Sequence, residues 1–249
     1  MKIVHISDTH GPKGHTKLEI PECDVLVHSG DIGGRTTLLE LVEFLTWFEA
    51  QPGKKKIFCA GNHDLILDKK WVFSQKERGA GDLQCRIIEE EFRAALEIIQ
   101  KFGVTYLNNR DYVYEGVKFF GSPYSPSFHR RNWAFNADRG EEISKEWSKI
   151  PSDVNVLITH SPPYKILDRV EDKFREADGE DLNIGCKDLY DIIKKRLFDL
   201  KLHCFGHIHD NYGVVLKSVS NTRRIYFSNG AVVTNQYEQL VTKPLIITI

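Results

Sequence analysis

The chain has 249 residues, of which 41% are hydrophobic and 28% charged, and its formal net charge at pH 7 is -1. This composition is typical of a globular protein with a substantial core. Lysine and arginine are dispersed along the chain, so no strongly basic surface for nucleic acid or for a membrane is indicated. We therefore expect neither nucleic acid nor a membrane as a partner.

The cysteines are scattered and form no CxxC pair, which argues against a disulfide framework and against a structural zinc site. They are Cys23, Cys59, Cys85, Cys186 and Cys204. The sequence begins "MKIVHISDTH", which is typical of a strand from the second residue onward. It has neither a signal peptide nor an apolar run long enough to cross a membrane. We expect reduced thiols and a cytoplasmic location.

Seven short apolar, β-branched runs have the length and composition of strands. In chain order they are Ile3–Ile6, Val25–Val27, Lys56–Cys59, Val154–Thr159, Leu202–Phe205, Arg224–Phe227 and Leu245–Ile249. Between them, apolar residues at helical spacing predict helices from Thr37 to Phe48, over Glu89–Phe102 and over Lys187–Leu200. Thr37 and Glu40 form a capping box for the first helix, and Gly103 is a stop for the second.

Two hairpins are also indicated. One spans Tyr112–Phe120 and turns at Glu115-Gly116, and the other spans Val214–Phe227 and turns at Ser220-Asn221. The chain thus begins as βαβ and adds antiparallel strands later, which predicts an α/β fold with two sheets face to face and helices outside. We expect one domain over residues 1–249. The polar stretches Asp68–Asp82 and Val170–Gly185 are either solvated loops or lids.

Residues of the types that bind metals directly follow five of the predicted strands. They are Asp8 and His10, then Asp31, then Asn62, His63 and Asp64, then His160, and finally His207 and His209. The carboxyl ends of strands in an open α/β sheet line one crevice, so these side chains should meet there. The remaining histidines have no such context: His5 and His28 should lie in the core or behind the site, and His15, His129 and His203 should have ordinary roles.

Carboxylate and imidazole together suit divalent ions such as Mn²⁺, Fe²⁺ and Zn²⁺. So many candidate ligands are more than one ion usually takes, so two ions that share a bridging carboxylate fit better. Metal pairs about 3.5–4 Å apart catalyse in-line displacement at phosphorus. The residues alone therefore indicate a metal-dependent phosphoryl-transfer site.

The order DxH, GD, GNHD, H and GHxH resembles the calcineurin-like metallophosphoesterase superfamily. The segments "GSPYSPSF", "WAFNADRG", "LITHSPP" and "GHIHDNYG" resemble its metallophosphoesterase-domain-containing subfamily. The resemblance covers nearly the whole chain. It implies a four-layer α/β/β/α sandwich of two mixed β-sheets flanked by helices, the metallo-dependent phosphatase fold.

The resemblance also implies a role for each ligand. Asp8, His10 and His209 would bind the first metal, Asn62, His160 and His207 the second, and Asp31 would bridge them. The metals would be two Mn ions, with Fe or Zn as alternatives, and a hydroxide between them would be the nucleophile.

Three neighbouring positions have roles outside the ligand set. His63 would lie beside the phosphate, where it would stabilise charge or protonate the leaving oxygen. Asp64 would either orient His63 or cap a turn. Gly61 and Gly206 would let the backbone turn sharply beside the ligands.

One departure from the protein-phosphatase branch of this superfamily bears on the substrate. That branch has an acidic residue and an arginine after its GD and a second arginine before its GNH. Here Gly34 replaces the acid, Arg35 matches the first arginine, and Ala60 stands at the second. Half of the arginine clamp is missing, although one of Arg130, Arg131 or Arg139 could replace it.

These features favour a phosphodiesterase that acts on small phosphodiesters or cyclic nucleotides, with Arg35 as a substrate contact. A phosphomonoesterase of the same fold, a nuclease and a non-catalytic scaffold are the alternatives. The oligomeric state stays open.

Overall fold

The computed structural model describes residues 1–128, 133–171, 181–236, 238, 241 and 243–249. The first sheet has the strand order β13 (Leu245–Thr248), β1 (Lys2–Ile6), β2 (Cys23–His28), β3 (Gly53–Phe58) and β4 (Thr105–Tyr106). The second has the order β11 (Gly213–Ser218), β12 (Arg224–Asn229), β10 (Leu202–Phe205), β9 (Val156–Thr159), β6 (Val117–Ser122) and β5 (Arg110–Tyr114). Both sheets are mixed, because β13, β11 and β5 run antiparallel to otherwise parallel neighbours.

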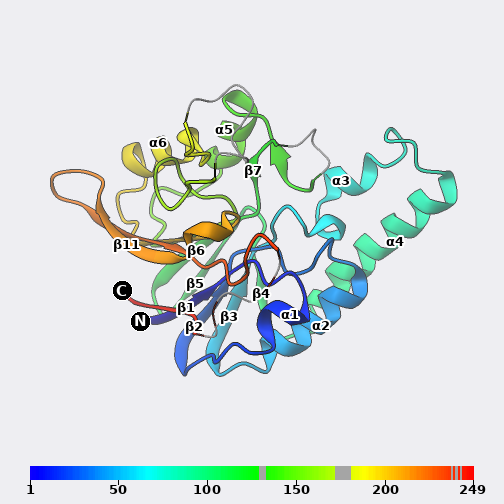
Figure 1. Cartoon of the computed structure of the whole chain (residues 1–249), viewed down its shortest axis with the longest axis horizontal. Helices are drawn as coiled ribbons and strands as arrows, with labels where there is room; N and C mark the ends of the chain where they lie inside the picture. Colours follow the sequence, from blue (N-terminus) through cyan, green and yellow to red (C-terminus); the bar gives the residue numbers. More distant parts are fainter. Residues whose placement is uncertain (129–132, 172–180, 237, 239–240, 242) are drawn as a thin grey trace.

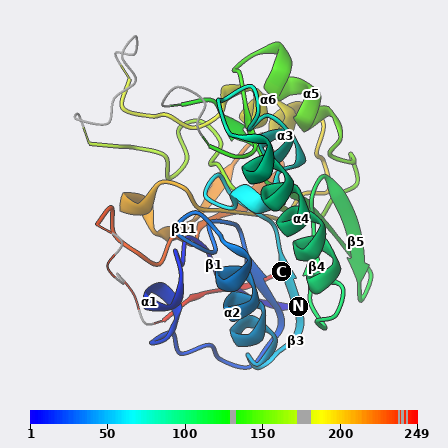
Figure 2. The same cartoon turned by 90° about the vertical axis from the view of Figure 1, so that its right-hand side faces the viewer.

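Helices cover the outer face of each sheet (Figures 1 and 2). The first sheet packs against α2 (Leu38–Glu49) and α4 (Asp82–Ile99), and the second against α5 (Glu141–Ser148) and α6 (Lys187–Lys195). Shorter elements are α1 (Pro12–His15), η1 (Leu65–Leu67), α3 (Lys69–Phe73), β7 (Ser125–Pro126), β8 (Asn136–Ala137) and η4 (His209–Asn211). The expected four-layer α/β/β/α sandwich is confirmed.

Strand β1 is apolar except for Lys2 and His5, and its burial explains this composition. Its side chains alternate between two buried layers, as the two-residue period of a strand requires. Val4 and Ile6 pack toward Phe44 of α2, whereas Ile3 packs between the sheets against Phe119 of β6. Both faces of β1 are therefore buried, and β1 is fixed in the middle of the molecule.

The seven predicted strands, the two hairpins and the three predicted helices are all present, with shifted ends. Helix α4 begins at Asp82 and not at Glu89. Its first two turns were missed; their apolar residues Leu83 and Ile87 are exposed. Gly103 is not the cap of α4: the helix ends at Ile99 with Gln100 as its C-cap, and the Gly103 amide donates to Glu49 Oε1 instead.

One further expectation needs correction. The stretch Asp68–Asp82 is not simply a loop, because it contains α3, whose N-terminus is capped by the Asp68 side chain. In addition, the sequence analysis did not predict helix α5 or the short helix α1. Of the second polar stretch, residues 172–180 lie outside the described part of the chain, and the residues on either side of them pair through a bridge between Arg169 and Asn183.

Backbone hydrogen bonds join the two sheets at the carboxyl ends of their central strands. The Ser7 amide after β1 donates to the Gly230 carbonyl after β12 (2.7 Å), and the Val232 amide donates to the Ser7 carbonyl (3.0 Å). The polar segments that follow the parallel strands β1, β2 and β3 of the first sheet thus meet those that follow β9 and β10 of the second. Among the described residues, no helix is long and apolar enough to span a bilayer.

The capping box at the start of α2 gives a prediction about stability. The Thr37 side chain accepts from the Glu40 amide, and Glu40 returns the bond to the Thr37 amide. Thr37→Ala should lower the free energy of unfolding by about 1 kcal/mol, measured by urea denaturation. Thr46→Ala is the matched control on the same helix, since Thr46 only bonds back to the Val42 carbonyl. Equal effects of the two substitutions would contradict the capping role.

Candidate metal centre

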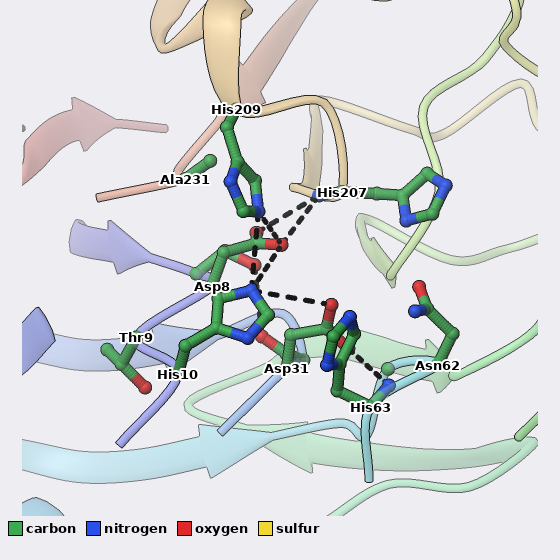
Figure 3. A network of polar contacts seen from close by, with 12 residues as sticks. Asp8, Thr9, His10, Asp31, Asn62, His63, His207, His209 and Ala231 are labelled. Carbon is green, nitrogen blue, oxygen red and sulfur yellow. Dashed lines mark hydrogen bonds and ion pairs between the residues drawn. The ribbon is translucent and has the colours of Figure 1, made fainter. Parts of the chain in front are cut away.

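Seven predicted ligands converge where the two sheets meet, and Figure 3 labels all of them except His160. The first group contains Asp8, His10 and His209, whose ligand atoms all lie within 4.8 Å of one another. The Nε2 atoms of His10 and His209 are 3.3 Å apart, and His209 Nε2 lies 3.3 Å from Asp8 Oδ1. These three side chains come from the ends of β1 and β10, which are far apart in sequence.

The second group contains Asp31, His160 and His207, whose ligand atoms also lie within 4.8 Å of one another. His160 Nε2 is the centre of the group, 3.2 Å from His207 Nδ1 and 2.9 Å from the side-chain oxygen of Asn62. His207 and His209, two residues apart, thus face different groups.

Asp31 connects the two groups. Its Oδ2 atom lies 3.3 Å from His160 Nε2 and 3.7 Å from His10 Nε2. Its other oxygen, Oδ1, accepts the His63 backbone amide at 2.8 Å. A single carboxylate therefore reaches both groups while the backbone of the third loop holds it in place.

Carbonyl groups behind the site fix how two of the histidines present their nitrogens. His209 Nδ1 donates to the Thr234 carbonyl and His160 Nδ1 to the Ser29 carbonyl, each at 3.0 Å. A carbonyl can only accept, so a proton lies on each Nδ1, and Nε2 is the nitrogen that would offer its lone pair to a metal ion once it is deprotonated. Metal-binding histidines are commonly oriented by such outer hydrogen bonds.

The charges of the site favour a bound cation. The side chains of Asp8 and Asp31 belong to residues that are 0% and 2% exposed. Burial acts to raise the pKa of Asp31, but the surrounding imidazoles of His160, His63 and His10 together outweigh it and hold that pKa well below its usual value. For His160, burial acts to lower the pKa and the Asp31 carboxylate raises it to about 9. Because buried ionised carboxylates need a positive partner, this oxygen and imidazole donor set suits divalent metal ions.

Four of the seven side chains project from backbone in the left-handed region. The φ angles are 53° at Asp8, 46° at His10, 58° at Asp31 and 70° at His207. Such angles are uncommon outside glycine and are typical of functional sites that the surrounding structure over-determines. The His207 amide, for example, donates to both Asp8 carboxylate oxygens at 3.0 Å.

The two glycines beside the ligands lie at turns and leave room for carboxylates. The Asp64 amide donates to the Gly61 carbonyl (3.2 Å), and the Ile208 amide donates to the Gly206 carbonyl (2.8 Å), so the chain turns at both positions as expected. Neither glycine is among the described glycines with positive φ. A Cβ at Gly206 would lie 1.9 Å from Asp8 Oδ2, and one at Gly61 would lie 2.3 Å from Asp31 Oδ1. These positions are therefore glycine because carboxylates pack directly against their backbone.

His63 stands beside the two groups. Its Nδ1 atom donates to the Gly34 carbonyl (2.5 Å), and its ring meets the His10 ring edge to face, with centroids 4.6 Å apart. His63 could also join a ligand set, since its ligand atom lies within 4.8 Å of those of His10 and Asp31.

Asp64 is fully buried and fastens two loops together. Its Oδ2 accepts the amides of Asp31 (3.0 Å) and Gly61 (2.7 Å), and its Oδ1 accepts the Ile32 amide (3.0 Å) and the Thr36 hydroxyl (2.5 Å). These four bonds support the capping alternative for Asp64, because they fix the backbone that carries the bridging carboxylate.

A family model described as "Calcineurin-like phosphoesterase" matches residues 1–211. The chain belongs to this family. It is 30% identical over 248 residues to the human protein named "Metallophosphoesterase domain-containing protein 1", covering 99% of this chain and 70% of that protein. It is 33% identical over 246 residues to the Caenorhabditis elegans "UPF0046 protein K07C11.7", covering 99% and 74%.

A solved structure supports the same fold. The structure of "Phosphopantetheinyl Hydrolase (PptH)" from Mycobacterium tuberculosis superposes with a TM-score of 0.54 at 16% identity, covering 95% of this chain and 90% of that one. Membership of the calcineurin-like phosphoesterase family identifies the chain as a hydrolase that acts on phosphoesters.

The arginines are arranged differently from the clamp of the protein-phosphatase branch. The Arg35 guanidinium lies over the Trp133 ring, 5.4 Å from its centroid. Arg139 donates to the carbonyls of Gly185 (3.0 Å) and Ile184 (2.6 Å). Arg130 and Arg131, like His129, lie outside the described residues.

Two aromatic residues near the site were not predicted to have roles. Trp133 stacks on His63, with ring centroids 4.2 Å apart, and Phe128 meets the His207 ring at 5.1 Å. Phe128 is the last residue of the motif "GSPYSPSF", and Trp133 is the first residue of "WAFNADRG". These motifs were the available signal in the sequence, but they were used to recognise the family and not to assign contacts.

The other described histidines are buried and lie outside the ligand set. His5 bonds to the hydroxyls of Ser228 and Ser29, His203 bonds to a threonine hydroxyl, and His15 stacks on a tryptophan. His28 bonds to the Thr9 hydroxyl behind the site. All five cysteines are free thiols, as expected.

The substitution Asp64→Asn tests whether Asp64 caps the loops or orients His63. The amide cannot accept four hydrogen bonds as the carboxylate does, so the loops should loosen. We expect the free energy of unfolding to fall by about 2–4 kcal/mol, and Mn²⁺ binding, measured by calorimetry, to weaken as well. A variant with unchanged stability and metal affinity but reduced turnover would show instead that Asp64 acts through His63.

Proposed function

We propose that this hydrolase is a dinuclear metal-dependent phosphodiesterase acting on small phosphodiesters, cyclic nucleotides among them. The observation that carries the proposal is the position of Asp31, whose Oδ2 atom lies within 3.7 Å of an imidazole nitrogen from each of two ligand groups. One shared carboxylate between two three-residue groups is what a pair of adjacent ions requires.

In this proposal each ion has its own ligands. Asp8, His10 and His209 hold one ion, and Asn62, His160 and His207 hold the other, with Asp31 common to both. Mn²⁺ is the metal that we expect, and Fe²⁺ or Zn²⁺ would accept the same donors. When bound, such a pair activates water for attack at phosphorus and neutralises charge on the phosphate.

His63 contacts the substrate in this proposal. Because its Nδ1 proton is engaged by the Gly34 carbonyl (2.5 Å), Nε2 is the nitrogen that faces a phosphate bound at the ligand groups. From there it stabilises negative charge or gives a proton to the leaving oxygen.

The preference for diesters follows from charge. A phosphomonoester near neutral pH carries nearly two negative charges and a diester carries one. A guanidinium pair suits the dianion, since each binds two phosphate oxygens. This site has Arg35 beside it but Ala60, which is fully buried, at the second arginine position. Two metal ions with one arginine are adequate for a monoanion.

Aromatic faces next to the ligands support an organic substituent on the phosphate. Phe128 lies against His207 and Trp133 against His63, with ring centroids 5.1 and 4.2 Å apart. A diester carries two organic groups to place on such surfaces, whereas a monoester carries one.

The test compares two esters with the same leaving group. With Mn²⁺ at mildly alkaline pH, kcat/KM should be higher for bis(p-nitrophenyl) phosphate than for p-nitrophenyl phosphate. A clear preference for the monoester would replace the proposal with a phosphomonoesterase. Hydrolysis of neither ester, together with no bound Mn, Fe or Zn, would favour a non-catalytic scaffold.

A further inference from the structure

Trp133 forms a layered contact with two residues of the site. Its indole stacks on the His63 imidazole at an interplanar angle of 29°, with centroids 4.2 Å apart. The Arg35 guanidinium lies over the same indole, 5.4 Å from the ring centroid. These residues come from three different loops, so the stack ties together segments that share no secondary structure.

The backbone beside Trp133 is fastened to the loop that carries His63. The Ala134 amide donates to the Asn62 carbonyl (3.1 Å), and the Phe135 amide donates to Asp68 Oδ2 (2.7 Å). Asp68 is itself held by the Lys70 amide (2.8 Å). The indole is therefore held in a fixed position beside His63.

Among the described residues, three contacts bear on the orientation of the His63 ring. The Gly34 carbonyl holds Nδ1, the His10 ring lies edge to face at 85°, and the Trp133 indole covers one face of the ring. A hydrogen bond at one ring atom leaves the ring able to rock about that bond. The flat contact with the indole removes this freedom.

We propose that Trp133 is a positioning residue: its indole fixes the plane of the His63 imidazole so that Nε2 faces the ligand groups. The catalytic part of this inference rests on the proposed function, whereas the ring orientation does not. Positioning matters because a displacement of about 1 Å at a reacting group can cost on the order of 10²-fold in rate.

The orientation is tested without turnover, by NMR of metal-free protein with labelled histidine. The His63 resonance is the one that disappears in His63→Ala. An indole shields protons above its face, so this resonance should move downfield in Trp133→Leu and stay close to its original place in Trp133→Phe. An unmoved His63 resonance in Trp133→Leu would overturn the proposal.

A double-mutant cycle tests the consequence for catalysis, with Mn²⁺-loaded protein and the better of the two p-nitrophenyl esters. Trp133→Leu should lower kcat by roughly 10²-fold with a smaller change in KM, and Trp133→Phe should retain most activity. In the His63→Ala background, Trp133→Leu should cost nothing further, since contacting residues that act together are not additive. An equal loss in both backgrounds would overturn the proposal.

Trp47→Leu is the matched control, because Trp47 makes the same kind of stack on His15, with centroids 4.2 Å apart, away from the ligand groups. It should leave kcat and the His63 resonance unchanged. If the unmutated protein hydrolyses neither ester, the proposed function fails, and the NMR experiment still decides the positioning of His63.

Discussion

The site depends on the cost of burying ionised carboxylates. Asp8 and Asp31 lie at the meeting point of two sheets, almost without solvent contact. Isolated charges of one sign would be unstable there, so the site must supply cations or protons. Histidines from both sheets surround the pair, and the rest of the local structure serves to hold these side chains close together.

Holding these side chains so close together requires unfavourable backbone conformations. Asp8, Asp31 and His207 adopt left-handed angles, and the loops approach each other so closely that Gly61 and Gly206 have no room for a side chain. Asp64 offsets part of this cost, because one buried carboxylate accepts four donors from the segments around it. These hydrogen bonds fasten the loops to one another and hold the ligand candidates close together.

The sequence was sufficient to predict most of this architecture. Apolar strands such as β1 and β9 are buried on both faces, so their composition alone identified them, and the ligand candidates were found because each follows such a strand. The first turns of α4 were missed because they extend past the core, where Leu83 and Ile87 are exposed and no packing partner marks the start of the helix. The stack of Trp133 on His63 could not be predicted, since neither residue spacing nor composition reveals contacts between distant loops.

The same limit applies to polar contacts with the backbone. Gly34 was noted only as the absence of an acidic side chain, yet its carbonyl holds His63 Nδ1. Asp64 presented two alternatives in the sequence, and only the positions of its four donors favour one. Side-chain chemistry could be read from the chain, whereas backbone donors and acceptors become visible only in the folded structure.

The central claim is that Asp31 is shared by two ions, and crystals grown with Mn²⁺ test it most directly. Anomalous diffraction at the manganese edge should show two peaks about 3.5–4 Å apart, with the Asp31 carboxylate between them. One ion should contact Asp8, His10 and His209, and the other Asn62, His160 and His207. A single peak, or an ion bound by His63, would contradict the account.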